Sequence, residues 1–124
     1  MVLREGEKAP NFELQTSDGE TFDLSQFDGE WKIIFFFAKS GSPTCKRGCL
    51  SFKEQYELFR SLEPPVEVIG ISQDTVEQQK KFKDELDLPF YLLSDSNRDV
   101  SETYGVPLHL GMFPSKSSFV IGPD

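Results

Sequence analysis

Apolar and polar residues alternate in two short stretches near the front of the chain. Asn11–Gln15 and Thr21–Leu24 have the period of two that is typical of a half-buried strand, and Asp18-Gly19 between them is a turn signal. The pattern predicts an N-terminal β-hairpin. Trp31–Phe37 is almost continuously apolar, which predicts a strand buried on both faces of a sheet.

The next apolar pattern has the period of a helix. We predict a helix from Pro43 to about Leu62, because Glu63-Pro64-Pro65 would end it there. Its core-facing stripe is formed by residues at steps of four and three: Cys45, Cys49, Phe52, Tyr56 and Phe59. Both cysteines of the protein are therefore expected to face the core.

Strands and helices alternate along the rest of the chain. The expected elements are a strand Val66–Ser72, a helix after the Thr75–Gln78 capping-box pattern to about Leu86, a strand Phe90–Leu93, a short helix capped by Ser96 or Asn97 and ending at Gly105, and a strand Ser118–Ile121. This order predicts an α/β fold with a central, mainly parallel sheet and helices on both faces. The length predicts a single domain of residues 1–124.

Charge and composition exclude several classes of partner. The formal net charge of −8 argues against nucleic acid and anionic membranes as partners, and no apolar run is long enough to span a membrane. Residues 1–8 lack the apolar core of a signal peptide, so a cytoplasmic location is expected. Two cysteines in a reducing compartment are more often catalytic or redox-active than structural.

The segment between the first buried strand and the long helix has the features of a reactive thiol site. Ser42 is a good N-cap and Pro43 suits the first helical position, which puts Cys45 in the first turn. The positive end of the helix dipole favours the thiolate there. The window 38–53 contains no acid and four basic residues: Lys39, Lys46, Arg47 and Lys53.

Other interpretations of these residues remain open. Cys45 and Cys49 also fit buried core thiols on an apolar stripe. Lys116, for which the resemblance described below implies a catalytic role, also fits an ordinary solvated lysine. Two cysteines and the distant His109 cannot fill a four-ligand zinc site, so no metal is expected.

The cysteine segment resembles that of the peroxiredoxins, especially the atypical Q-type branch, also called bacterioferritin comigratory proteins. That family has a Pro, a Thr four residues later and the peroxidatic Cys three residues after that, following a buried strand. Ala38, Ser42 and Cys45 stand at these positions. The family's catalytic Arg lies three residues before the aromatic of a Phe-Val-Ile-like strand, where this chain has Lys116 before Phe119.

Several further segments look like the same family. They are the front hairpin, the Phe-Phe-Phe-Ala-Lys run, Val68–Ser72, Leu93–Asp95 and Tyr104–Val106. The resemblance therefore extends over the whole chain.

The resemblance implies a thioredoxin-like fold and a thiol-dependent peroxidase that reduces hydrogen peroxide or organic hydroperoxides. Cys45 would become a sulfenic acid and Cys49 would resolve it as a Cys45–Cys49 disulfide, which thioredoxin or a similar dithiol protein would reduce. Ser42 would hold the peroxide and Lys116 would stabilise negative charge. No cofactor is implied, and the protein would be a monomer or a dimer.

The chain departs from the family pattern in five places, the first being Ser42, which replaces the Thr but keeps its hydroxyl group. Ala38 replaces the Pro, Lys116 replaces the Arg and its planar set of donors, and Cys49 follows Cys45 by four residues where the Q-type spacing is five. Family members also continue beyond the position of Asp124, so a C-terminal strand and helix are expected to be missing. The changes at Ala38 and Lys116 and the short cysteine spacing favour an alternative, a degenerate, non-catalytic thioredoxin-fold module for binding or redox sensing. The retained Ser42 and both cysteines favour the peroxidase.

Overall fold

A computed structural model describes residues 10–37, 43–104, 108–109, 113–114 and 117–122. The main sheet has six strands in the order β2-β1-β5-β4-β3-β8. Their bounds are β1 Glu13–Thr16, β2 Thr21–Asp23, β3 Trp31–Phe36, β4 Val66–Ser72, β5 Tyr91–Ser94 and β8 Ser117–Ile121. Two short strands, β6 (Leu108–His109) and β7 (Phe113–Pro114), pair separately. The helices are the 3₁₀ helix η1 (Leu24–Phe27), α1 (Pro43–Ser61), α2 (Val76–Leu86) and α3 (Asp99–Thr103).

The sheet is mixed, which corrects the expectation of a mainly parallel sheet for the structure as a whole. The central strands β5, β4 and β3 are parallel, as expected from strands joined by helices. The front hairpin joins β5 through β1 in antiparallel fashion, and β8 joins β3 in antiparallel fashion. The alternating pattern indicates how consecutive elements connect, but it does not reveal in which direction the strands at the edges run.

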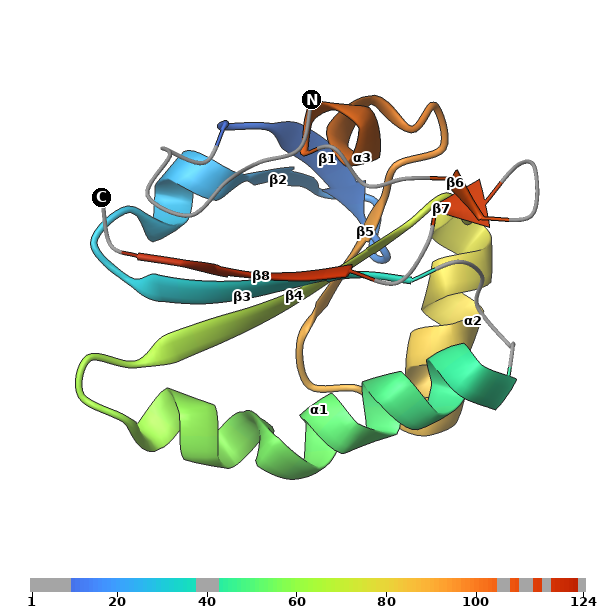
Figure 1. Cartoon of the computed structure of the whole chain (residues 1–124). Helices are drawn as coiled ribbons and strands as arrows, with labels where there is room; N and C mark the ends of the chain where they lie inside the picture. Colours follow the sequence, from blue (N-terminus) through green and yellow to red (C-terminus); the bar gives the residue numbers. More distant parts are fainter. Residues whose placement is uncertain (1–9, 38–42, 105–107, 110–112, 115–116, 123–124) are drawn as a thin grey trace.

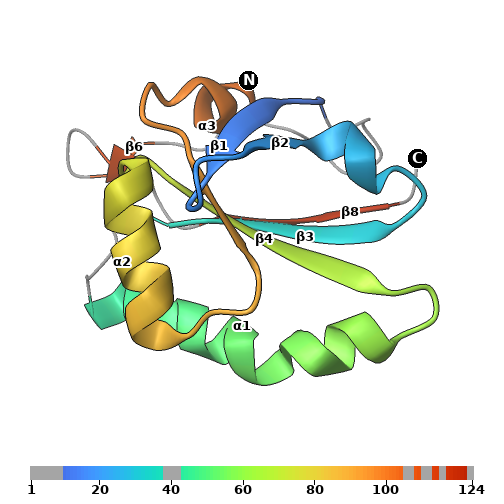
Figure 2. The same cartoon turned by 180° about the vertical axis from the view of Figure 1, so that it is seen from behind.

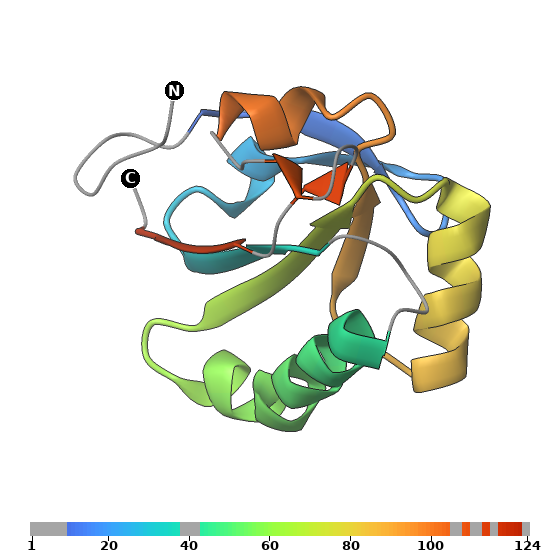
Figure 3. The same ribbon diagram turned by 45° about the vertical axis from the view of Figure 1, so that its right-hand side comes forward.

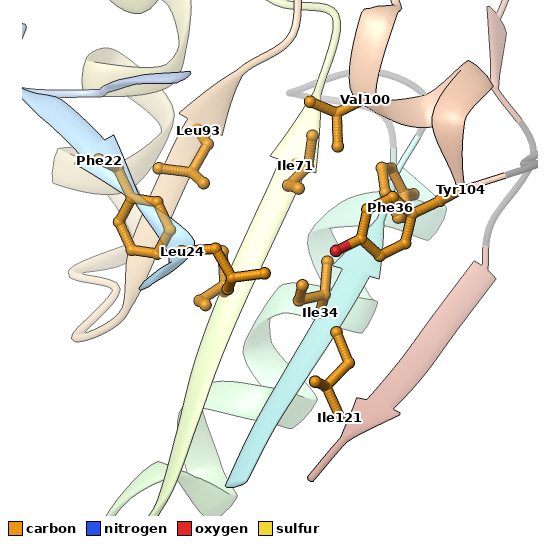
Figure 4. Close-up of a cluster of buried hydrophobic side chains, with 10 residues drawn as sticks. Phe22, Leu24, Ile34, Phe36, Ile71, Leu93, Val100, Tyr104 and Ile121 are labelled. Carbon is orange, nitrogen blue, oxygen red and sulfur yellow. The ribbon is translucent and has the colours of Figure 1, made fainter. Parts of the chain in front are cut away.

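Helices cover both faces of the sheet, as predicted (Figure 1). On one face, η1 and α3 contribute to a cluster of buried side chains that Figure 4 draws in close-up. Its members are Phe22, Leu24, Ile34, Phe36, Ile69, Ile71, Leu93, Val100, Tyr104 and Ile121. On the other face lie α1 and α2, seen from behind in Figure 2. Their cluster contains both cysteines.

The starts of the two shorter helices differ in how well the sequence predicted them. At α2 the Thr75 side chain accepts from Gln78 N at 3.2 Å and the Gln78 side chain accepts from Thr75 N at 2.9 Å, so the predicted capping box is present. At α3 the predicted caps, Ser96 and Asn97, are wrong. Asp95 satisfies this helix start: its carboxylate accepts from Val100 N and Ser101 N, while Arg98 adopts a left-handed conformation at the helix boundary.

Asp95 lies just beyond the end of β5, and its side chain is buried. Desolvation raises the pKa of this carboxyl group, and the two backbone donors oppose that effect.

Within the described part of the chain, no helix is long and apolar enough to cross a membrane.

Candidate active site

The strand β3 leads directly into the region of the two cysteines. Beyond its last residue the backbone still follows the neighbouring strand, because Phe37 N donates to Ile71 O at 3.0 Å. The helix α1 begins at Pro43, so Cys45 lies in its first turn and Cys49 one turn later. A residue pair at this spacing lies on one face of a helix.

Both thiols are excluded from water. Cys45 is 3% exposed and Cys49 is 0% exposed, and neither forms a disulfide. They belong to one cluster of buried side chains, which we call the thiol cluster: Phe35, Phe37, Cys45, Cys49, Val68, Phe82, Leu86, Leu88, Phe90 and Leu92. Phe52, Tyr56 and Phe59 pack against it from α1 and are partly buried. The predicted core-facing stripe of α1 is therefore confirmed.

An aromatic stack supports α1 just after the cysteines. The rings of Phe35 on β3 and Phe52 on α1 lie parallel, with centroids 4.4 Å apart and an interplanar angle of 13°. The ring of Phe35 fits because residue 70 on β4 is glycine: a Cβ atom there would lie 2.7 Å from Phe35 Cζ. The strand β4 thus leaves room for the ring that supports α1.

Polar contacts hold the second half of α1. Lys53 Nζ donates to Leu86 O at 2.9 Å, which ties α1 to the end of α2; Figure 3 shows the two helices side by side, α1 in green and α2 in yellow. Tyr56 Oη donates to the Glu67 carboxylate at 3.0 Å. Arg60 bridges this carboxylate, at 3.6 Å, and that of Glu30, at 3.0 Å.

The environment of Tyr56 disfavours its ionised form. Burial is the main cause, and the negative charge of Glu67 adds to it, so the pKa of Tyr56 rises to about 12. The hydroxyl group therefore stays protonated and donates to Glu67 across the physiological range.

The structure describes two of the four predicted site residues. It brings Cys45 and Cys49 into one cluster. Ser42 and Lys116 lie outside the described residues, as does Ala38. The predictions missed Phe35 and Gly70 as the support of α1, because a continuously apolar strand does not indicate which of its residues face a given helix.

An open cleft of about 340 Å³ lies elsewhere in the fold, at the hairpin and the connection from β5 to α3. Its lining residues are Glu13, Leu14, Gln15, Thr21, Ser94, Asp95, Ser96, Asn97 and Asp99. None of them is a predicted site residue. Among the side chains that the structure describes, no group of three or more His, Cys, Asp or Glu is arranged to hold a metal ion.

Comparisons with known proteins point to one family. A family model described as the AhpC/TSA family matches residues 5–124. Peroxiredoxin Q, chloroplastic, from Oryza sativa subsp. japonica is 37% identical over 120 residues, which cover 96% of this chain and 54% of the relative. Putative peroxiredoxin bcp from Coxiella burnetii is 35% identical over 116 residues, which cover 94% of this chain and 76% of the relative.

The fold has a close counterpart among solved structures. Peroxidoxin BcpB from Mycobacterium tuberculosis superimposes with a TM-score of 0.84 at 28% identity, covering 96% of this chain and 79% of that one. The expected thioredoxin-like peroxiredoxin fold is thereby confirmed. The chain spans about half the length of the plant relatives it matches, 54% for the rice protein. The chain belongs to the AhpC/TSA family, and the relatives it matches within that family are peroxiredoxins Q and Bcp.

Proposed function

We propose that this chain carries the catalytic part of a thiol-dependent peroxidase, with Cys45 as the peroxidatic residue and Cys49 as the resolving residue. One observation carries the proposal: the two cysteines share one buried apolar cluster on the first two turns of a helix that follows a central strand. Family membership supports the same chemistry.

The first step forms a sulfenic acid. The Cys45 thiolate attacks the terminal oxygen of a hydroperoxide, the O–O bond breaks, and the leaving oxygen takes up a proton as water or an alcohol. In this proposal the hydroxyl group of Ser42 holds the peroxide, and the ammonium group of Lys116 stabilises the negative charge that develops on the leaving oxygen. No cofactor or metal enters the step.

The second step forms a disulfide. The sulfur of Cys49 attacks the sulfur of Cys45, an S–S bond forms, and the hydroxyl group of the sulfenic acid leaves as water. Residues four apart on a regular helix have Cβ atoms about 5–6 Å apart, whereas a disulfide requires about 3.5–4.5 Å. The first turns of α1 must therefore rearrange when the bond forms. A dithiol protein of the thioredoxin type then restores both thiols by exchange.

Mass spectrometry of the intact chain after treatment with one equivalent of hydrogen peroxide tests both assignments. The wild type is expected to lose two hydrogens, Cys49→Ser to gain oxygen, and Cys45→Ser to remain unchanged. If Cys49→Ser turned over with thioredoxin as fast as the wild type, the resolving role would be wrong. A wild type that neither lost hydrogen nor gained oxygen would favour the non-catalytic module.

The role of Lys116 has its own test. Lys116→Arg should speed the oxidation of Cys45 by hydrogen peroxide, because the guanidinium group offers more donors, and Lys116→Met should slow it. Equal rates in both variants and the wild type would mean that Lys116 is an ordinary solvated lysine.

The proposal also includes a cytoplasmic location and a monomeric or dimeric state.

A further inference from the structure

Two basic residues of α1, Lys46 and Arg47, lie near its N-terminal end, where the helix dipole is unfavourable to positive charge. From Pro43 to Lys53 the helix contains Lys46, Arg47 and Lys53 and no acid, whereas Glu54 and Glu57 follow in its second half. The N-terminal end of a helix is its positive end, so acidic side chains there stabilise the helix and basic side chains destabilise it. The stability of α1 therefore does not account for Lys46 and Arg47.

Ion pairing does not account for these two cations either, in the part of the chain that the structure describes. Both side chains are exposed, and neither takes part in any of the ion pairs among the described residues. Lys53, in contrast, is directed to Leu86 O. Two adjacent, solvated positive charges next to Cys45 thus belong to a chain whose formal net charge is −8.

Positive charges near Cys45 favour its thiolate in the first step, and they also bear on a second step of the proposed reaction. Hydrogen peroxide and simple alkyl hydroperoxides are uncharged near neutral pH, so a basic surface does not attract them. The exchange step instead requires a second protein to bring a thiolate to the Cys45–Cys49 disulfide. Complementary charges at such an encounter speed association and fix its orientation.

We propose that Lys46 and Arg47 form a docking site for a dithiol reductant protein whose surface around its attacking thiol is acidic. The inference rests on the proposed function. The reductant thiolate attacks one sulfur of the Cys45–Cys49 disulfide, that S–S bond breaks, and a mixed disulfide forms. The second thiol of the reductant then releases the chain with both cysteines reduced, and the reductant leaves as its own disulfide.

Small thiols of different charge test the electrostatic part directly. The disulfide form is prepared with diamide and reduced with excess 2-mercaptoethanesulfonate, which is anionic, or 2-mercaptoethanol, which is neutral. The ratio of the two rates isolates the effect of charge, because any change in the disulfide itself affects both thiols. In Lys46→Glu/Arg47→Glu this ratio should fall about tenfold relative to the wild type. Lys81→Glu/Lys83→Glu, the same change of net charge on α2, should leave it within twofold.

A protein reductant tests the docking itself. With a thioredoxin of net negative charge, the rate constant for reduction should fall steeply as salt rises in the wild type and only weakly in the double variant. The double variant should also melt at a higher temperature than the wild type, because acids suit the first turns of α1. Slower reduction together with a higher melting temperature excludes damage to the fold as the cause.

The outcomes separate this inference from the proposed function. If hydrogen peroxide did not oxidise the wild type, the peroxidase proposal would fail, while the diamide-prepared disulfide would still report on the charges. An unchanged ratio of thiol rates in the double variant, or a reduction by thioredoxin that does not respond to salt, would overturn the docking site. A double variant that slowed only the reaction with a carboxylated hydroperoxide would assign the two charges to the substrate and overturn it as well.

Discussion

The two halves of α1 are held in different ways. The first two turns contribute two small thiol side chains to the thiol cluster. The second half is fixed by directional contacts: the Phe35–Phe52 stack, Lys53 on Leu86 O, and the contacts of Tyr56 and Arg60 with Glu67. The second half of the helix is therefore anchored to β3, β4 and α2.

This difference matches what the proposed chemistry demands. Closing a disulfide between residues four apart distorts a helical turn, and a helix without further anchoring would lose its remaining contacts as well. The boundary lies near Gly48, where a Cβ atom would meet nothing within 4 Å. Packing therefore does not require glycine at this position, and its low helix propensity makes the first turns easier to unwind.

The largest effect is expected from removing the anchor. Glu67→Ala leaves Tyr56 Oη and Arg60 without their shared, 5% exposed partner, so the free energy of unfolding should fall by about 2 kcal/mol. Urea unfolding measures this, with the exposed Glu57→Ala as a control that should change stability by about 0.5 kcal/mol or less. The rate at which hydrogen peroxide oxidises Cys45 should stay within twofold of wild type. A rate that fell with stability would mean that the two halves are not independent.

A smaller effect is expected at the boundary. Gly48→Ala should stabilise the reduced chain by about 1 kcal/mol, because alanine favours the helix and no neighbouring atom obstructs the new methyl group. The same substitution should disfavour the Cys45–Cys49 disulfide about fivefold in a glutathione redox buffer, since the disulfide form loses the added helical preference. Gln55→Ala provides the control, because it improves helix propensity in the anchored half. An equal shift of the disulfide equilibrium in both variants would contradict a boundary at Gly48.

The smallest effect is a dependence on alkaline pH. The pKa of Tyr56 is about 12 in the folded chain against an ordinary value of 10.0, so above pH 10 the unfolded chain loses this proton first and stability falls until about pH 12. Because Tyr56 is only half-buried, screening limits the loss to roughly 1 kcal/mol or less. Burial also raises the pKa of Tyr104 and adds a fall of the same sign. The contribution of Tyr56 is the difference in the free energy of unfolding between the wild type and Tyr56→Phe, measured by urea unfolding at several pH values. If the two free energies fell equally with pH, Tyr56 would make no contribution.

The sequence best predicts structural features that are determined by residues a few positions apart in the chain. The stripe of α1, the limits of β4 and the capping box of α2 each follow from residues a few positions apart, and all three are confirmed. The cap of α3 was assigned wrongly because the acceptor, Asp95, lies further from the helix start than a standard N-cap. Its carboxylate reaches the helix only because the chain turns through a left-handed Arg98, which no local pattern indicates.

Contacts that depend on the assembled sheet could not be predicted. Tyr56 reaches Glu67, and Arg60 reaches Glu30, only after α1 is laid across strands whose order in the sheet is not their order in the chain. The direction of β8 was likewise undetermined, because an apolar strand pattern reads the same in both directions. For the candidate site, the pattern indicated the two cysteines, while their support by Phe35 depends on the gap that Gly70 leaves in the next strand.

That gap at Gly70 limits how the chain can vary over evolutionary time. Even a methyl group at position 70 would meet the ring of Phe35 at 2.7 Å and the side chain of Leu92 at 2.9 Å. Replacing the glycine therefore requires the side chains of residues 35 and 92 to shift or become smaller, and either change at residue 35 disturbs the stack with Phe52. Four positions on three strands and one helix are thus bound to change together, so single substitutions among them are poorly tolerated while coordinated ones remain accessible.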